Sequence, residues 1–230
     1  MHFKLAILLL LCSPIVAFAD TIAIIGTGNV GIALGTEFAA QGHSVIYGSR
    51  SPLSLKTMDA VTRTGSNSSA KRPADAAALA DVIVLAVPGT VTEAVAKNLG
   101  DLSGKLVIDA TNPLVAEGDP PVFRYGVATS LGEIVQEIHP DAHVVKAFNT
   151  ITWQQMMDPK AANTPPVVPL AGNNDDAKKR VAGYVEGMGL DPLDLGGIEI
   201  SQWTERMVVI MLNNRFTGTE KFDLIFQRRD

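Results

Sequence analysis

The chain has 230 residues, of which 47% are hydrophobic and 19% charged, as is ordinary for a compact globular protein with its own core. The formal net charge of −5 at pH 7 argues against nucleic acid as a partner, because nucleic-acid-binding proteins gain most of their affinity by neutralising phosphates. The single cysteine, Cys12, has no partner for a disulfide, and the spacing of the four histidines gives no metal site.

The N-terminus has the pattern of an export signal. A weakly basic start at His2 and Lys4 precedes an apolar run that ends in the small-x-small triplet Ala17-Phe18-Ala19. We predict a signal peptide over residues 1–19 and a mature protein over residues 20–230. The run is too short and too poorly flanked for a transmembrane span, so we expect none in the mature chain. Cleavage would place the protein in the periplasm or outside the cell, whereas an uncleaved segment would leave it cytoplasmic or membrane-anchored.

After this segment, continuous apolar stretches alternate with stretches of helical apolar spacing. Strands of a parallel sheet have this character because both faces of the sheet are covered. Strands are predicted at residues 21–25, 44–47, 82–87, 106–108, 144–148, 167–171 and 191–195. Helices are predicted at residues 29–41, 74–80, 91–99, 130–138, 175–188 and 198–213. The alternation predicts an α/β fold of Rossmann type, with a doubly wound, mostly parallel sheet in a single domain and a C-terminal helical cap.

Two stretches have no clear period. Residues 56–72 begin with helical spacing, but the Gly, Ser and Asn of residues 65–69 indicate a loop. Residues 115–128, which contain Pro120-Pro121, are predicted to be irregular. A loop of this length in a compact domain is usually functional, and this one follows a strand end where ligands lie.

The segment between the first strand and the first helix has a G-x-G-x-x-G pattern, Gly26-Thr27-Gly28-Asn29-Val30-Gly31. In this pattern the first glycine permits a tight turn, the second lets the backbone approach a pyrophosphate, and the third lets helix and strand pack closely. The helix N-terminus offers free N–H groups and a partial positive charge to the phosphates. Because a strand precedes the pattern and a helix follows it, it predicts dinucleotide binding.

The end of the second strand indicates which dinucleotide binds. Proteins that read NAD place Asp or Glu about 20 residues beyond the glycines, where the carboxylate holds the ribose 2′-hydroxyl. Here the stretch is Tyr47-Gly48-Ser49-Arg50-Ser51, which has no carboxylate. Ser49 can donate a hydrogen bond, and the Arg50 guanidinium has the charge and shape to bind a 2′-phosphate. We therefore predict NADP(H) as the cofactor.

Taken in chain order, these and later motifs resemble those of the NADPH-dependent F420 reductase family, which shares its dinucleotide domain with the ferric-reductase part of STEAP proteins. The later motifs are Leu85-Ala86-Val87-Pro88, Asp109-Ala110-Thr111-Asn112-Pro113-Leu114, Val144-Val145-Lys146-Ala147-Phe148-Asn149-Thr150, Ala171-Gly172-Asn173 and Asp194-Leu195-Gly196-Gly197. The resemblance covers about residues 21–225, nearly the whole predicted mature chain.

The resemblance implies a set of cofactor contacts and an acceptor. The NADP contacts would fall on Thr27, Gly28, Asn29, Val30, Ser49, Arg50, Val87 and Pro88. Asn112 and Pro113 would border the nicotinamide, with Phe148 and Asn149 as the opposite wall. The activity implied is hydride transfer between NADP(H) and F420 or a flavin-like small molecule, and the assembly implied is a homodimer.

Hydride transfer between such rings needs no side-chain acid or base, because the cofactors carry the chemistry, and we accordingly predict no catalytic side chain. His43, His139 and His143 are interpreted as packing or surface residues. The apolar stripe of Met207, Met211 and Leu212 is interpreted as helical core or a dimer contact rather than a flavin site.

Two other functions stay open. One is a redox sensor that binds NADP(H) without turnover. The other is a small-substrate dehydrogenase related to pyrroline-5-carboxylate reductase. That class needs a long helical domain at its C-terminus, whereas the residues after Thr150 contain two more strand patterns.

Overall fold

The computed structural model describes residues 19–161, 164–222, 224 and 226. The predicted signal peptide lies outside the described residues, apart from Ala19 at its end. Within the described part, no helix is long and apolar enough to cross a membrane.

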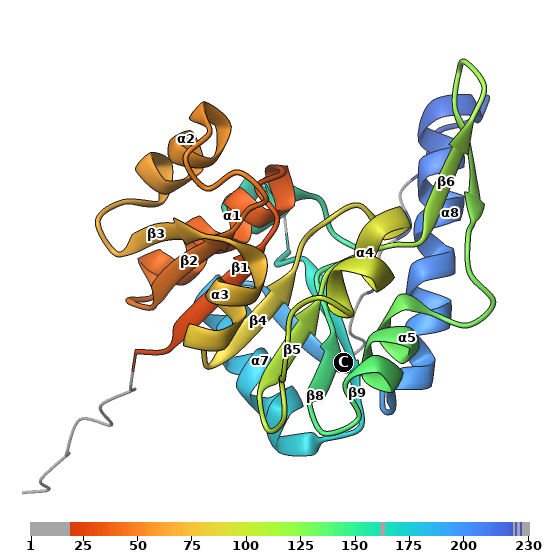
Figure 1. Cartoon of the computed structure of the whole chain (residues 1–230). Coiled ribbons are helices and arrows are strands. Elements are labelled where there is room, and N and C mark those ends of the chain that lie inside the picture. The colour runs from red at the N-terminus through yellow and green to blue at the C-terminus, as the bar shows by residue number, and fades with distance from the viewer. Residues whose placement is uncertain (1–18, 162–163, 223, 225, 227–230) are drawn as a thin grey trace, which may run out of the picture.

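In the described part of the chain, eight strands form one sheet in the spatial order β10-β9-β8-β5-β4-β1-β2-β3 (Figure 1). The strands are β1 (Thr21–Ile25), β2 (Ser44–Gly48), β3 (Ser68–Lys71), β4 (Val82–Leu85), β5 (Leu106–Asp109), β8 (His143–Lys146), β9 (Val167–Gly172) and β10 (Asp191–Asp194). Neighbouring strands run parallel except for β8 and β9, which are antiparallel. The predicted doubly wound, mostly parallel sheet is therefore confirmed.

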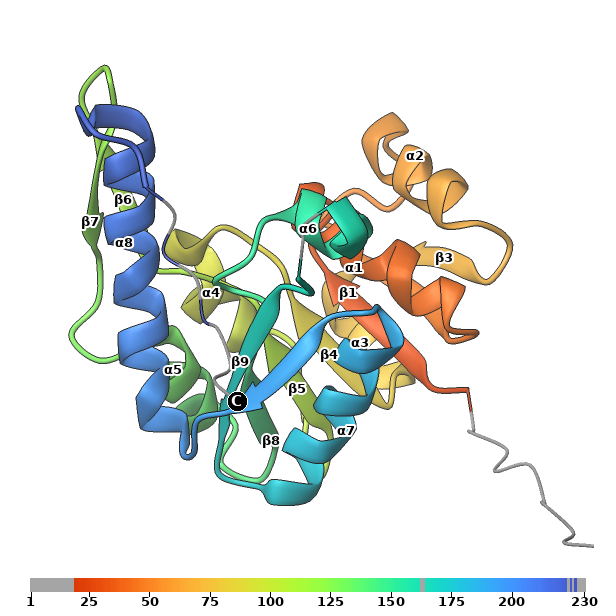
Figure 2. The ribbon, with the colours of Figure 1, turned by 180° about the vertical axis from the view of Figure 1, so that it is seen from behind.

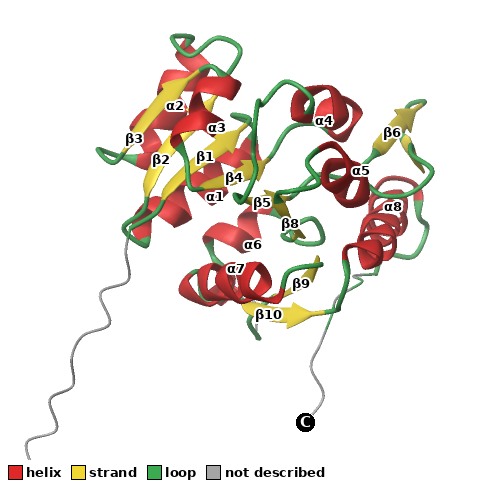
Figure 3. Ribbon diagram, turned by 60° about the horizontal axis from the view of Figure 1, so that its bottom comes forward, coloured by secondary structure: helices red, strands yellow, loops and turns green. Residues whose placement is uncertain are grey.

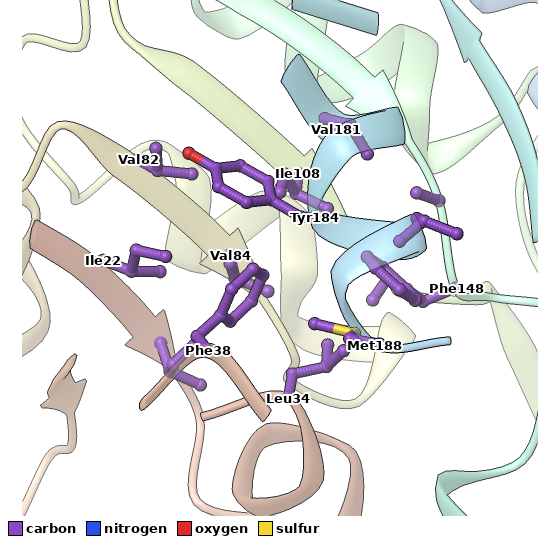
Figure 4. Packing of buried hydrophobic residues seen from close by; sticks show 14 of the residues in the cluster. Ile22, Leu34, Phe38, Val82, Val84, Ile108, Phe148, Val181, Tyr184 and Met188 are labelled. Carbon is purple, nitrogen blue, oxygen red and sulfur yellow. The ribbon is translucent and has the colours of Figure 1, made fainter. Parts of the chain in front are cut away.

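Helices cover both faces of this sheet (Figure 3). They are α1 (Asn29–Ala40), α2 (Leu55–Thr64), α3 (Pro73–Leu79), α4 (Gly89–Ala96), α5 (Leu131–Ile138), α6 (Trp153–Met157), α7 (Asp175–Gly187) and α8 (Ser201–Thr217). Alternate residues of each central strand belong to opposite cores: Ile22 and Ile24 pack with α1 and α7, and Ala23 and Ile25 pack with α3, α4 and α5. Figure 4 shows the first core, where Phe38 of α1 meets Tyr184 of α7 edge to face.

Two predictions of irregular structure are wrong. Ser68 and Ser69, predicted to lie in a loop, belong to the edge strand β3, which pairs with β2. Residues 115–128, predicted to be irregular, contain the antiparallel hairpin of β6 (Leu114–Glu117) and β7 (Val122–Tyr125). Strand β7 is held by tertiary contact, because the side chain of Asn213 in α8 bonds the N–H and the carbonyl of Phe123.

Helix α8 and the hairpin lie side by side at one end of the molecule, away from α2 and β3 (Figure 2). The aromatic rings of Phe123 and Phe216 are in contact there, with centroids 5.5 Å apart. The C-terminal helical cap is thus present as predicted, and it packs on the hairpin as well as on α5.

A buried cluster of charges joins α8 to the sheet. The Nζ atom of Lys146, at the end of β8, lies 2.8 Å from Asp109 Oδ2 and 2.5 Å from Glu205 Oε1, and all three side chains are at most 1% exposed. The same Nζ donates a hydrogen bond of 2.6 Å to the carbonyl of Thr111. Glu205 also accepts hydrogen bonds from the Leu131 N–H at 3.0 Å and the Tyr125 hydroxyl at 2.7 Å.

One ammonium serves two buried carboxylates, so the cluster carries an excess of negative charge when both are ionised. Burial raises the pKa of Glu205, and the charge of Asp109 adds to the rise while Lys146 opposes it. Burial and the neighbouring Glu205 also raise the pKa of Tyr125, which keeps its hydroxyl a hydrogen-bond donor.

Replacing Lys146 by methionine tests this cluster. We expect Lys146→Met to lower the free energy of unfolding by about 3–5 kcal/mol, because it leaves two buried carboxylates without their cation. The exposed ion pair between Glu93 of α4 and Lys97, at the C-terminal end of the same helix, offers a control. Lys97→Met should change the free energy of unfolding by less than about 0.5 kcal/mol. Urea denaturation measures both, and similar losses for the two variants would contradict the assigned role of Lys146.

Candidate functional site

The glycine turn joins β1 to α1 with a geometry that only glycine permits at two positions. Gly26 has φ +124°, and a Cβ there would collide with the carbonyl of Ala86 after β4. A Cβ at Gly31 would collide with the carbonyl of Gly26. A Cβ at Gly28 would meet no protein atom within 4 Å, so this glycine faces open space on the side where a ligand can approach.

The N-terminus of α1 presents unpaired donors to that space. Gly28 is the N-cap, no side chain caps the helix, and the first helical bond runs from Ile32 N–H to Gly28 O at 2.9 Å. Among the described residues, no acceptor is found for the N–H groups of Asn29, Val30 and Gly31. Free N–H groups at the positive end of a helix suit an anion such as a pyrophosphate.

The end of β2 holds Ser49 in place and leaves Arg50 exposed. Ser49 Oγ is 2.9 Å from Thr57 Oγ1 and accepts a hydrogen bond from the N–H of Ser51. Arg50 makes no ion pair with the described residues, so its guanidinium is available to a ligand. The Ser49 N–H donates to the carbonyl of Lys71, which brings the end of β3 beside it.

Sequence reasoning missed two cations, Lys71 and Arg72, which the pairing of β3 with β2 brings to the same edge of the sheet as Arg50. Gly48 pairs with Lys71, and Arg72 follows as the N-cap of α3. Both cations are exposed, and together with Arg50 they form a basic group at the ends of β2 and β3. The signal that could have found them is the short polar segment at residues 68–71, which becomes an edge strand only when it pairs with β2.

The ends of β4, β5 and β8 meet on the other side of the glycine turn. Val87 and Pro88 follow β4, and a Cβ at Gly89 would collide with the carbonyl of Asn112 after β5. Asn112 Nδ2 donates to the carbonyl of Asn149 at 3.0 Å, and Asn149 Nδ2 donates to Asn112 Oδ1 at 3.1 Å. Asn112 and Asn149, which were predicted to lie on opposite sides of a nicotinamide, are thus hydrogen-bonded to each other.

A cavity of about 920 Å³ opens beside these residues. The sheet side contributes Val30, Ala110, Asn112, Phe148, Asn149 and Thr150 to its lining, and α8 contributes Val208, Met211, Leu212, Asn214 and Arg215. Met211 and Leu212, interpreted as helical core or a dimer contact, line this cavity. Lys221, Phe222, Leu224 and Phe226 of the C-terminal segment line it as well.

None of His43, His139 and His143 lines this cavity. His43 is buried and packs edge to face against Tyr184, and its ring Nδ1 accepts a hydrogen bond from the Asp20 N–H. Burial lowers the pKa of His43, which favours the neutral ring that this hydrogen bond needs. His139 bonds the carbonyl of Ala96, so the expectation of packing roles is confirmed for both. The described residues include no group of three His, Cys, Asp or Glu side chains that could hold a metal.

Comparison with known proteins shows a consistent set of relatives. The family model described as NADP oxidoreductase, coenzyme F420-dependent, matches residues 21–113. A crystal structure from Arthrobacter sp. FB24, named as a candidate F420-dependent NADP reductase, superposes with a TM-score of 0.80 at 30% sequence identity. The match covers 91% of this chain and 100% of that one. The chain belongs to the F420-dependent NADP oxidoreductase family.

Two curated proteins extend the comparison for this family member. The F420-dependent NADP reductase of Methanothermobacter thermautotrophicus is 28% identical over 206 residues, which cover 84% of this chain and 88% of that protein. Rat metalloreductase STEAP3 is 27% identical over 195 residues, but the chain spans only 37% of its length. The protein is therefore an NADP-dependent oxidoreductase with a Rossmann-type fold, as its sequence predicted.

The residues of this oxidoreductase fit an NADP molecule. The free N–H groups of α1 match a pyrophosphate, and the unpaired Arg50 matches a 2′-phosphate. The space beside Gly28, which a Cβ would enter, allows close backbone approach.

Two glycine variants separate binding from folding in the turn. Gly28 has φ −85° and ψ 179°, which alanine adopts freely, so Gly28→Ala should change the free energy of unfolding by less than about 1 kcal/mol, with the entropy gain in the unfolded chain offset by the poorer N-cap. It should nevertheless weaken NADP⁺ binding at least about tenfold, because its methyl group stands where the pyrophosphate approaches. Gly31→Ala should instead destabilise the fold by about 1–3 kcal/mol. Urea denaturation and calorimetric titration measure the two effects, and full NADP⁺ affinity in Gly28→Ala would contradict the site.

Proposed function

We propose that the protein transfers hydride between the nicotinamide of NADP(H) and F420 or a flavin-like acceptor bound in the 920 Å³ cavity. The observation that carries the proposal is the position and lining of this cavity. It adjoins Val30 of the dinucleotide turn and Asn112 after β5, so it lies where a nicotinamide bound at the carboxyl edge of the sheet would end. Its volume is within the range that cofactor-sized ligands occupy.

The cofactor residues are assigned as the resemblance and the geometry together suggest. We assign the pyrophosphate to the turn and the 2′-phosphate to the end of β2, with the nicotinamide near the ends of β4, β5 and β8. The residues are Gly26, Thr27, Gly28, Asn29, Val30, Gly31, Ser49, Arg50, Val87, Pro88, Asn112 and Pro113.

The cavity lining supports a reaction without an acid or base from the protein. Among the described residues that line it, the ionisable side chains are Arg215 and Lys221, so the lining offers no carboxylate or histidine as a base. NADPH supplies the hydride when it is bound. The protein's part is to orient the two rings and to exclude water with the apolar side chains of Val208, Met211 and Leu212.

Turnover with candidate acceptors tests the proposal. Purified protein should oxidise NADPH when F420, FMN or FAD is added, with a clear preference for one of them, and stopped-flow absorbance follows both reactants. NADPH binding without reduction of any of the three would contradict hydride transfer to this class and favour a redox sensor.

The cofactor preference is tested at Arg50. We expect Arg50→Ala to weaken NADPH binding by about 1–3 kcal/mol and NADH binding very little, because only NADPH has the 2′-phosphate. Arg63→Ala serves as control, since Arg63 is also exposed but pairs with Asp59 on α2. Calorimetric titration measures all four affinities, and equal losses for NADPH and NADH would exclude the 2′-phosphate assignment.

A further inference from the structure

Two residues that line the cavity carry buried side-chain oxygens with no hydrogen-bond partner among the described residues. They are Asn149 Oδ1 and Thr150 Oγ1, on side chains that are 6% and 9% exposed. Buried polar groups in folded proteins are nearly always paired, because an unpaired one has lost its water without a replacement. Both residues line the cavity, so a ligand there can supply the missing partners.

The hydrogen bonds around Asn149 fix which end of its amide is unpaired. Asn112 Nδ2 donates to the backbone carbonyl of Asn149, so Asn112 Oδ1 is the atom that faces the Asn149 side chain. Asn149 must then turn its own Nδ2 toward Asn112, at 3.1 Å, because the opposite orientation would bring two oxygens together. Its Oδ1 is left as an acceptor without a partner among the described residues, on a residue that lines the cavity.

The backbone before Asn149 holds this arrangement rigidly. Phe148 has φ +64°, a left-handed conformation that a bulky side chain rarely adopts and that surrounding structure must impose. Its ring is buried in the core beside α7 (Figure 4), and the preceding Ala147 N–H is bonded to the carbonyl of Asp109 at 3.1 Å. The turn at Phe148 ends β8 and brings Asn149 to Asn112.

The course of a dinucleotide across this fold indicates what meets Asn149. With the pyrophosphate at the N-terminus of α1 and the 2′-phosphate at Arg50, the adenosine half lies over β2. The nicotinamide half then extends the opposite way, over the ends of β4, β5 and β8, where Asn112 and Asn149 lie. The nicotinamide ring carries a carboxamide, whose NH₂ group is a hydrogen-bond donor.

We propose that Asn149 is a specificity-determining residue that recognises the nicotinamide carboxamide by accepting a hydrogen bond from its NH₂ group at Oδ1. The inference rests on the proposed NADP(H) site and names the side chain that fixes the rotation of the ring. Asn112 is a positioning residue, since it acts by orienting the Asn149 amide. The Thr150 hydroxyl can donate or accept by rotation, so it does not distinguish one ligand group from another.

The test is a double-change cycle, in which one group is removed from the protein and one group from the ligand, singly and together. The ligands are NADP⁺ and its 3-acetylpyridine analogue, in which a methyl group replaces the carboxamide NH₂. Calorimetry of wild type and Asn149→Ala with each ligand gives four dissociation constants. We expect Asn149→Ala to weaken NADP⁺ binding about five- to tenfold and to weaken binding of the analogue less than about twofold. Asn98→Ala, an exposed asparagine on the surface after α4, should change neither.

A third ligand separates this inference from the proposed function. The fragment 2′,5′-ADP lacks the nicotinamide, so it should bind wild type and Asn149→Ala equally if the variant is folded. If neither NADP⁺ nor 2′,5′-ADP binds wild type, the proposed function fails. If both bind, but Asn149→Ala weakens NADP⁺ and the analogue equally, only the assignment of Asn149 is overturned.

Two remaining outcomes also decide the matter. Unchanged NADP⁺ affinity in Asn149→Ala, with a raised KM for the acceptor, would mean that Oδ1 faces the acceptor and would overturn the assignment. If Asn149→Ala does not fold, wild type alone gives the answer. It should bind NADP⁺ at least about fivefold more tightly than the analogue, and equal affinity for the two would overturn the proposal.

Discussion

The pairing of the buried Lys146 ammonium with Asp109 and Glu205 is the interaction on which the cavity end of the molecule depends. Asp109 ends β5, Lys146 ends β8, and Glu205 lies in the first half of α8, so the cluster joins the sheet to the C-terminal helix. The same helix supplies Val208, Met211 and Leu212 to the cavity. A shift of α8 would therefore move a whole wall of the cavity relative to the edge of the sheet that is proposed to hold the nicotinamide.

This cluster favours one position of α8 on the sheet, because all of its buried polar groups have hydrogen-bond or ion-pair partners only in that position. A buried ion pair stabilises little by itself, since removing both charges from water offsets much of their attraction. Lys146 Nζ reaches two carboxylates and the Thr111 carbonyl, and Glu205 also accepts the Leu131 N–H. A displaced helix would leave several of these groups buried and unpaired, which is the costly state. The same lysine thus fixes the loop after β5, where Thr111 precedes Asn112, and the helix opposite.

Local pattern in the sequence was enough for the sheet and the glycine turn, because a buried parallel strand is apolar on both faces and the turn needs glycine at fixed spacing. It was not enough for β3 or for the hairpin of β6 and β7, whose residues become strands only through partners distant in the chain. The orientation of Asn149 was also beyond reach, because it follows from the left-handed backbone of Phe148 and from a side chain 37 residues away. Met211 and Leu212 gave an apolar stripe that was compatible with core and with cavity alike.

The cavity is built from two parts of different character. The sheet edge is rigid: Phe148 is locked in the core, Asn112 and Asn149 bond each other, and Lys146 ties the strand ends together. The opposite wall consists of side chains on α8 together with Lys221, Phe222, Leu224 and Phe226. Helix α8 is attached to the sheet through Glu205 and to the hairpin through Asn213. Substitutions on that wall can change the shape offered to an acceptor without disturbing the strand ends. The strand ends, whose positions the fold fixes, would therefore hold the nicotinamide. The side chains of α8 and of the C-terminal segment would select the hydride acceptor.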